Sequence, residues 1–374
     1  MIDAKNTMLI LLLGVTVWSV SLAFKLPSHA STLAASAQQA TAVPMLHSIL
    51  GIAPVPALDP MPTGDDLGKA YVTGVDMAYN AGARGVELDK TWKDLEPSQG
   101  HFNLDDLESA TSYMIGIRGF EVLLNIQIIN TVSREMPTDL NGQPFDSPAV
   151  RGRFHTLIDA IAPHLNPHYR YVAIGNEVDV YLATSGEWKA YQAFYEDSIA
   201  YIHKVLPWIK VGVTCTFDGA TLKSPKEVAA LNTTSDIYIV SYYPLKGNFV
   251  VRSPDAPLTD FPKLAAMAGT RPLVLQEVGY PTSELLSSSE QQQAAFVTNV
   301  FKAWAALGDK ISWLDFYMLH DMPESLCNDL SQYYRLPDSA NFKAYLCSLG
   351  LHKANGTPKL GWQAFMDSVS GIQS

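Results

Sequence analysis

The sequence predicts an α/β protein built as a single (β/α)8 TIM barrel. Short apolar segments alternate eight times with amphipathic segments between residue 45 and the C-terminus, as expected for parallel strands joined by helices. No G-x-G-x-x-G or P-loop sequence occurs, whereas a doubly wound open sheet, the main alternative, often carries a phosphate-binding loop. Polar residues follow several of the strands, which is where barrels place their functional sites.

The first half of the barrel is predicted from four strand and helix pairs. The strands are short apolar runs, and the helices are amphipathic stretches with boundary signals such as Asn103 before one helix and Gly119 after it. The strands are expected at 45–53, 84–91, 121–129 and 171–175, and the helices at 65–81, 104–117, 148–161 and 186–205.

The second half repeats this pattern. The strands are expected at 209–215, 236–242, 272–276 and 311–320, and the helices at 225–231, 261–268, 289–307 and 359–369. A long segment, 321–345, lies between the eighth strand and the last helix. Because loops after barrel strands surround the site, we expect this segment to decide how a substrate enters.

The N-terminal region has the pattern of an export signal. Residues 8–24 are a nearly continuous apolar run between Lys5 and Lys25, followed by small-residue cleavage candidates at 28–30 and 35–37. The run is just long enough to cross a bilayer, so an uncleaved membrane anchor is the alternative. We therefore expect a signal peptide or anchor in residues 1–30, a linker in 31–43 and the folded domain in 44–374, with the domain secreted, periplasmic or extracellular.

Composition and cysteine usage narrow the classes of partner. The net charge of −11 and the pI near 5.2 argue against binding nucleic acid or an anionic membrane surface. Cys327 and Cys347 could form a disulfide in an oxidising compartment, and Cys215 is expected to be a buried thiol. No cysteine spacing resembles a zinc site, and no metal or organic cofactor is indicated. The oligomeric state is left open.

Two glutamates follow the fourth and seventh predicted strands. Glu177 comes directly after the strand at 171–175, and Glu277 follows the strand at 272–276. Burial at such a position raises the pKa of a carboxyl group, which suits a proton donor, although a loop glutamate that merely follows a strand is the ordinary alternative. Strands four and seven of a closed barrel face each other across its mouth, so the two side chains can converge. A converging pair of unlike carboxyl groups is what glycoside hydrolysis requires.

Further side chains at the strand ends are candidates for binding a sugar. Trp92, Trp313 and His320 are predicted to contact sugar rings, although either tryptophan alone is more often a packing residue. Tyr243 follows the sixth strand and is predicted to hydrogen-bond Glu277.

Several motifs together resemble the clan A glycoside hydrolases. These are retaining enzymes on (β/α)8 barrels, and the matching segments follow one another over most of the body of the chain. The matching segments are Gly175-Asn176-Glu177, 276–281 (QEVGYP), 92–102 (WxxLEPxxGxF) and 350–359 (GLHxxxGxxK). The Ser241–Pro244 segment is similar to endo-β-galactanases, and the sequences around both glutamates are similar to endo-β-1,3-glucanases.

The resemblance implies a retaining mechanism on β-glycosidic bonds of an oligo- or polysaccharide. Glu177 is then the general acid/base, Glu277 the nucleophile, and Asn176 the ligand of the sugar 2-hydroxyl. We expect the two carboxyl groups to lie about 5–5.5 Å apart. A non-catalytic carbohydrate-binding protein on the same scaffold is the alternative. The glycan, its linkage and endo or exo action are left open.

One position departs from the pattern. Many clan members carry an arginine five residues before the second-strand tryptophan, where it contacts the nucleophile, and this chain has Glu87 there. Arg84 and Lys90 are near in sequence but at different offsets. No arginine role is therefore assigned.

Overall fold

The computed structural model describes residues 48–373. The predicted signal peptide or anchor and the linker lie outside the described residues. Between residues 48 and 373 we find no helix with the length and apolar character that a membrane crossing requires.

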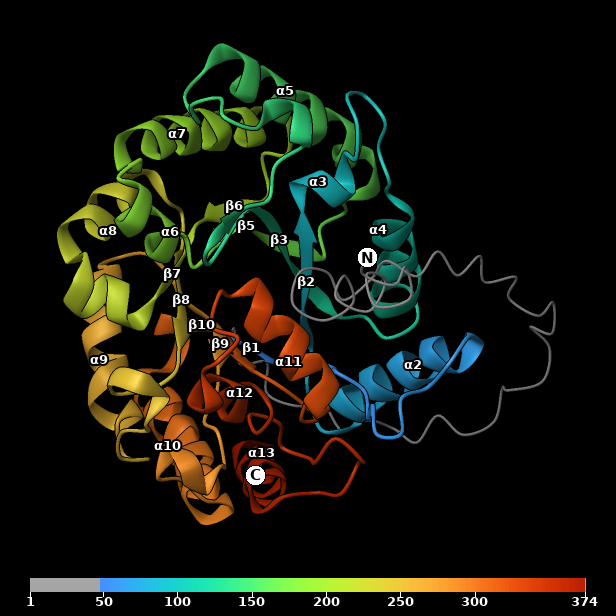
Figure 1. Cartoon of the computed structure of the whole chain (residues 1–374), viewed down its shortest axis with the longest axis vertical. Coiled ribbons are helices and arrows are strands. Elements are labelled where there is room, and N and C mark those ends of the chain that lie inside the picture. The colour runs from blue at the N-terminus through green and yellow to red at the C-terminus, as the bar shows by residue number, and fades with distance from the viewer. Residues whose placement is uncertain (1–47, 374) are drawn as a thin grey trace.

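The strands form a closed parallel barrel, as predicted (Figure 1). The sheet order β6-β5-β3-β2-β1-β10-β9-β8-β7 ends on β6 and β7, which are separated in the chain by Val213 alone, so they act as one interrupted fifth strand that closes the ring. A two-residue strand, β4 (Ser133–Arg134), pairs antiparallel with β3. The barrel strands are β1 (Ile49–Ile52), β2 (Gly85–Thr91), β3 (Glu121–Asn130), β5 (Tyr169–Asn176), β6 (Lys210–Gly212), β7 (Thr214–Thr216), β8 (Tyr238–Tyr242), β9 (Leu273–Val278) and β10 (Ile311–Phe316).

The predicted helices surround the ring of strands (Figure 1). Ser147 caps α5 by accepting a hydrogen bond from the Val150 amide, and Ser289 caps α10 by accepting one from the Gln292 amide. These outer helices are α2 (Asp65–Asn80), α4 (Asp105–Ala110) with a π turn at Thr111–Ile115, α5 (Pro148–Ile161), α7 (Trp188–Val205), α8 (Pro225–Leu231), α9 (Pro257–Ala268), α10 (Glu290–Leu307) and α13 (Leu360–Gln373).

Four further helices were not predicted. The helix α3 (Trp92–Leu95) directly follows β2, and α6 (Val178–Ser185) directly follows Glu177. The segment expected to be a loop contains α11 (Glu324–Tyr333) and α12 (Ala340–Leu346). These last two helices lie at the barrel mouth.

The inside of the barrel is filled near the N-terminal ends of the strands. Apolar side chains from several strands pack there in one buried cluster, as in other barrels of this kind. Its members are Leu123, Tyr171, Ala173, Ile237, Ile239, Val274 and Trp313. The space that is left for a site therefore lies above this cluster, toward the C-terminal ends.

Candidate active site

A cavity of about 350 Å³ lies at the C-terminal ends of the strands. Its volume is near the lower end of the usual range of about 300–1,000 Å³ for small-molecule sites. Polar side chains at or next to the strand ends line it from around the barrel, and they include Glu87, Asp89, Gln127, Thr131, Asn176, Glu177, Thr216, Ser241, Tyr243 and Glu277. Both predicted catalytic glutamates thus face one cavity.

A strained turn after β5 directs Glu177 into the cavity. Gly175 has φ 87° and Glu177 has φ 45°, the left-handed region that a side chain other than glycine rarely adopts. A Cβ at position 175 would lie 2.6 Å from the Tyr191 hydroxyl oxygen, which donates a hydrogen bond of 2.7 Å to the Ile174 carbonyl oxygen. Glycine is therefore required at position 175, and the fold holds Glu177 in an unfavourable conformation that serves the site.

Two hydroxyl groups hold the Glu177 carboxylate. Ser241 Oγ donates to Glu177 Oε1 at 2.5 Å, and Thr131 Oγ1 donates to Oε2 at 2.9 Å. Ser241 is also the β8 residue paired in register with Glu277 of β9. Ser241 therefore connects the two glutamates, and the structure brings the predicted pair together.

Glu277 is held by Tyr243 and Asn176, as the sequence suggested for Tyr243. The Tyr243 hydroxyl donates to Glu277 Oε2 at 2.5 Å, and a hydrogen bond from Asn176 also favours the ionised form of Glu277. Asn176 is fixed in turn by Gln276, whose Nε2 donates to Asn176 Oδ1 at 3.0 Å. Asn176 thus contacts the residue before Glu277 as well as Glu277 itself.

The glutamate pair (Glu177 and Glu277) is less acidic than ordinary carboxyl groups. Burial, followed by the charge of Glu177, raises the pKa of Glu277 to about 8, against the effect of Tyr243. Burial also raises the pKa of Glu177, although Ser241 and Thr131 lower it. Two neighbouring buried carboxyl groups disfavour double ionisation, so the glutamate pair retains a proton at neutral pH.

Acidic residues stand where the resemblance would place an arginine. Glu87 and Asp89 line the cavity from β2, and burial raises the pKa of Glu87 well above its usual range, with the charges of Asp89 and Glu277 adding to the effect. The amides of Asn125 and Gln127 donate to Asp89 Oδ1 at 2.8 and 2.9 Å. Burial raises the pKa of Asp89 as well, although its hydrogen bonds with Glu87, Asn125 and Gln127 lower it, so Asp89 ionises more readily than Glu87.

Neither nearby cation replaces the arginine. Arg84 is exposed, and its guanidinium donates to the carbonyl oxygens of Tyr79 and Ala83. Lys90 Nζ lies 2.6 Å from Asp106 Oδ2 in α4, outside the strands. The neighbourhood of Glu277 is therefore acidic.

The prediction that Trp92 contacts a sugar is wrong. Trp92 is fully buried, its Nε1 donates to Glu96 Oε2 at 3.0 Å, and its ring lies 5.3 Å from that of Phe154. It packs among helices outside the barrel because it continues the outward-facing positions of β2.

Trp313 and His320 also lie away from the cavity lining. Trp313 is fully buried in the interior cluster, with its ring 5.9 Å from Tyr171. His320 is buried, its Nδ1 lies 2.8 Å from the Val55 carbonyl oxygen, and its ring lies 4.9 Å from that of His352. Both have structural roles, so their assignment as sugar contacts is corrected as well.

The sequence reasoning missed several residues of the site. Thr131 and Ser241 contact Glu177 directly, and the alternation of Glu87 and Asp89 on β2 was a signal that both side chains face the same side. Aromatic residues from α12 and from the turn between α11 and α12 also line the cavity, and no pattern pointed to them; they are Tyr334, Phe342 and Tyr345.

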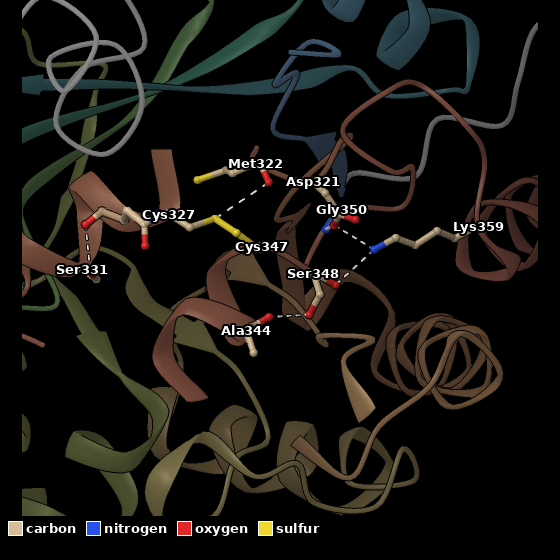
Figure 2. Close-up of a disulfide and its surroundings, with 10 residues drawn as sticks. Asp321, Met322, Cys327, Ser331, Ala344, Cys347, Ser348, Gly350 and Lys359 are labelled. Carbon is tan, nitrogen blue, oxygen red and sulfur yellow. Dashed lines mark hydrogen bonds and ion pairs between the residues drawn. A yellow bond between two sulfur atoms is a disulfide. The ribbon is translucent and has the colours of Figure 1, made fainter. Parts of the chain in front are cut away.

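The disulfide that the sequence left open is present. Cys327 of α11 is bonded to Cys347, the residue after α12, with their Cα atoms 5.9 Å apart (Figure 2). Cys215 is a buried free thiol, as predicted.

Comparisons with solved structures find glycoside hydrolases. The GH5_18 protein from Streptomyces cattleya in complex with GlcNAc matches with a TM-score of 0.67 and 16% identity over 87% of this chain and 80% of its own. The GH5_18 protein from Bifidobacterium longum subsp. infantis matches with a TM-score of 0.65 and 18% identity over 87% and 79% of the two chains. This chain has the (β/α)8 fold of glycoside hydrolases.

An exo-beta-1,4-mannosidase from Opitutaceae bacterium strain TAV5 has a TM-score of 0.63 and 19% identity, over 87% of this chain and 59% of its own. No family model matches, and no curated protein sequence does. The shared property is therefore the barrel, and the chemistry has to be argued from the residues in the cavity.

Proposed function

We propose that this chain is a retaining glycoside hydrolase that cleaves β-glycosidic bonds of an oligo- or polysaccharide. The observation that carries the proposal is the convergence of Glu177 and Glu277 in one cavity, connected through Ser241. The barrel shared with glycoside hydrolases supports it.

In this mechanism the two glutamates have different roles. Glu277 attacks the anomeric carbon and forms a covalent glycosyl-enzyme, while Glu177 protonates the departing oxygen. Glu177 then removes a proton from water, which releases the sugar with its configuration retained. Tyr243 orients Glu277, and Asn176 binds the sugar 2-hydroxyl.

The proton of the glutamate pair has to reside on Glu177 when the bond breaks. The Tyr243 and Asn176 donors stabilise a carboxylate at Glu277. The hydroxyl groups of Ser241 and Thr131 can rotate, so that they also accept a hydrogen bond from a protonated Glu177. The surrounding groups can therefore support the charge distribution that cleavage needs.

Two further observations bear on ligand and location. Solved structures of the same fold are complexes with GlcNAc and with Manb1-4GlcNAc, which supports a carbohydrate as the ligand class. The disulfide between Cys327 and Cys347 supports an oxidising compartment. We therefore propose that the protein acts after export, in the periplasm or outside the cell.

Reducing-sugar release from mannan, β-1,3-glucan, galactan and xylan, together with aryl β-glycosides, tests the activity. We expect hydrolysis by the wild type and a loss of at least about 10³-fold in Glu277→Ala. Exposed Glu196 provides a matched control, and Glu196→Ala should keep full activity. Sugar binding by the wild type without any hydrolysis would instead establish the non-catalytic binding protein.

A substrate whose leaving group needs no protonation distinguishes the role of Glu177 from that of Glu277. A dinitrophenyl glycoside needs no proton to depart, so Glu177→Ala should still form the glycosyl-enzyme from it, whereas Glu277→Ala should not. Proton NMR of the first product should show the β-anomer. An α-anomer would contradict the retaining mechanism.

A further inference from the structure

The segment from Glu324 to Cys347, here called the strap, crosses the mouth of the barrel. It begins after β10, and the end of α11 reaches the segment that follows β3: the Tyr333 hydroxyl donates to Glu135 Oε1 at 2.7 Å and contacts the Asn130 carbonyl oxygen at 3.5 Å. In the sheet, β1 and β2 lie between β10 and β3. Figure 1 shows α11 and α12, in orange to red, over the central strands.

The strap is attached again on the other side of the mouth. Asn341 Nδ2 donates to the Asn248 carbonyl oxygen at 2.8 Å, in the loop after β8. The ring of Phe342 lies 5.0 Å from Phe249 of the same loop. The ring of Tyr345 lies 5.4 Å from that of Tyr243, the partner of Glu277.

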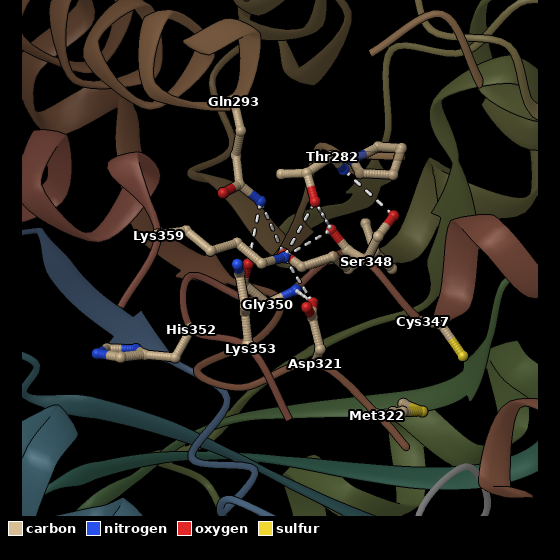
Figure 3. Close-up of polar contacts among 12 residues, drawn as sticks. Thr282, Gln293, Asp321, Met322, Cys347, Ser348, Gly350, His352, Lys353 and Lys359 are labelled. Carbon is tan, nitrogen blue, oxygen red and sulfur yellow. Dashed lines mark hydrogen bonds and ion pairs between the residues drawn. The ribbon is translucent and has the colours of Figure 1, made fainter. Parts of the chain in front are cut away.

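Covalent and ionic contacts fix the C-terminal end of the strap. The disulfide joins α11 to the end of α12 (Figure 2). Next to it, Lys359 Nζ lies 2.7 Å from Asp321 Oδ1 and donates to the Ser348 carbonyl oxygen at 3.2 Å and to Thr282 Oγ1 at 3.1 Å (Figure 3). Lys359 is buried, so this cluster holds the residues on either side of the strap to the loop after β9.

The strap covers the glutamate pair. Tyr334, Phe342 and Tyr345 line the cavity, and the charges of Glu177 and Glu277 raise the pKa of both tyrosines in addition to the effect of burial. Among the described residues that line the cavity, the exposed ones are Lys223 and Leu336. The cavity therefore reaches the surface at Lys223, in the segment after β7, and at Leu336, in the turn of the strap.

We propose that the strap makes this site a pocket for the terminal residue of a glycan, so that the enzyme removes single sugars from a chain end. The terminal sugar enters past Lys223 and Leu336, and Tyr334 and Tyr345 occupy the space that an uninterrupted polysaccharide would need to pass over the glutamate pair. The inference rests on the proposed glycosidase function and assigns its substrate class and its exo action.

Blocked chain ends provide the test. Tetrasaccharides of β-mannan, β-1,3-glucan, galactan and xylan are compared with the same compounds carrying a bulky ether group on the non-reducing terminal sugar. We expect a monosaccharide as the first product and cleavage of the blocked compounds at least about 100-fold slower. Disaccharides or longer oligosaccharides as first products, or equal rates on free and blocked compounds, would overturn the proposal.

Variants of the strap test whether the strap causes the slower cleavage of the blocked compounds. Tyr334→Ala should remove part of the strap's cover over the cavity. The ratio of the cleavage rate of blocked compounds to that of free compounds should therefore rise at least about tenfold. Tyr333→Phe loses one hydroxyl–carboxylate contact of the strap and should raise the ratio less. Tyr113→Phe is matched to it, because the Tyr113 hydroxyl donates to Asp76 Oδ1 at 2.6 Å away from the cavity, and it should leave the ratio unchanged. An unchanged ratio in both folded strap variants contradicts the inference.

Binding measurements separate this inference from the proposed function. Calorimetric titration of Glu277→Ala with free and blocked tetrasaccharides tests the pocket without turnover. Binding of the free forms alone supports the pocket even if the wild type hydrolyses none of them, an outcome that overturns the proposed function. Equal binding of both forms, or binding of neither, overturns the pocket.

Discussion

The charge buried at Glu277 should make the stability of this protein depend on pH, and Glu277→Gln should remove part of that dependence. The folded-state pKa is about 8 against an ordinary value of 4.5. At about 1.4 kcal/mol per pKa unit, ionising this group in the folded state costs at most about 5 kcal/mol. The cost belongs in part to Glu177, whose charge is the second cause of the shift.

The sign follows from the direction of that shift. Because the folded protein binds the proton more tightly than the unfolded chain, the stabilisation is complete below about pH 4.5 and is lost as the pH rises through about 8. Glutamine stays neutral throughout. The free energy of unfolding of Glu277→Gln relative to the wild type should therefore increase between these two pH values.

Urea unfolding followed by tryptophan fluorescence at about pH 5, 7 and 9 measures this difference, provided that the m-values agree. Glu196→Gln makes the same charge change on the exposed face of α7 and should give a difference that varies little with pH. If the difference for Glu277→Gln is flat, or decreases as the pH rises, the assignment of a costly buried charge to Glu277 is refuted.

Three other variants test separate contacts. Tyr243→Phe removes the donor to Glu277 and should lower kcat about 10- to 100-fold in steady-state kinetics, and an unchanged kcat would contradict the orienting role. Asp89→Asn removes a charge that raises the pKa of Glu277, so the acidic limb of the kcat/KM profile should move to lower pH; a shift to higher pH would argue against it. Cys327→Ser opens a loop with a sequence separation of 20 and should lower the unfolding free energy by about 3 kcal/mol, a loss that reductant reproduces in the wild type but does not add to the variant.

The barrel could be predicted because its strands and outer helices carry local signals. Strands such as β3 are long apolar runs, and α5 has a capping serine, a proline in its first turn and a buried face. The helices α11 and α12 carry weaker signals, because each is short and depends on tertiary contacts and on the disulfide. The helix α6 is rich in β-branched residues and directly follows a strand, so its sequence gave no clear helical period.

The site was predictable to the extent that strand ends define it. Glu177 and Glu277 end opposite strands of the barrel, and counting strands is enough to bring them together. Whether a side chain contacts the cavity also depends on the direction in which it points and on its position along the barrel axis. On β2, Glu87 and Asp89 face inward while Leu88 and Lys90 face outward, and the outward positions continue to Trp92.

Trp313 shows the effect of position along the barrel axis. It belongs to the interior cluster of the barrel, but lies one layer below the cavity. The alternation along a strand could have identified the outward direction of Trp92. The layer that Trp313 occupies depends on the tilt and register of the closed sheet, which cannot be read from local sequence patterns.

The acidic surroundings of Glu277 connect the departure at position 87 to the pH range of the proposed hydrolysis. A nucleophile has to be ionised, yet Glu87, Asp89 and Glu177 surround Glu277 where a cation would have lowered its pKa. The same burial keeps Glu177 protonated to a higher pH than an ordinary glutamate. Because the two carboxyl groups interact, the limbs of the pH profile belong to the glutamate pair and not to either residue alone. A glutamate in place of an arginine at position 87 is therefore compatible with the proposed hydrolysis. It shifts toward alkaline pH the interval in which Glu177 and Glu277 share one proton.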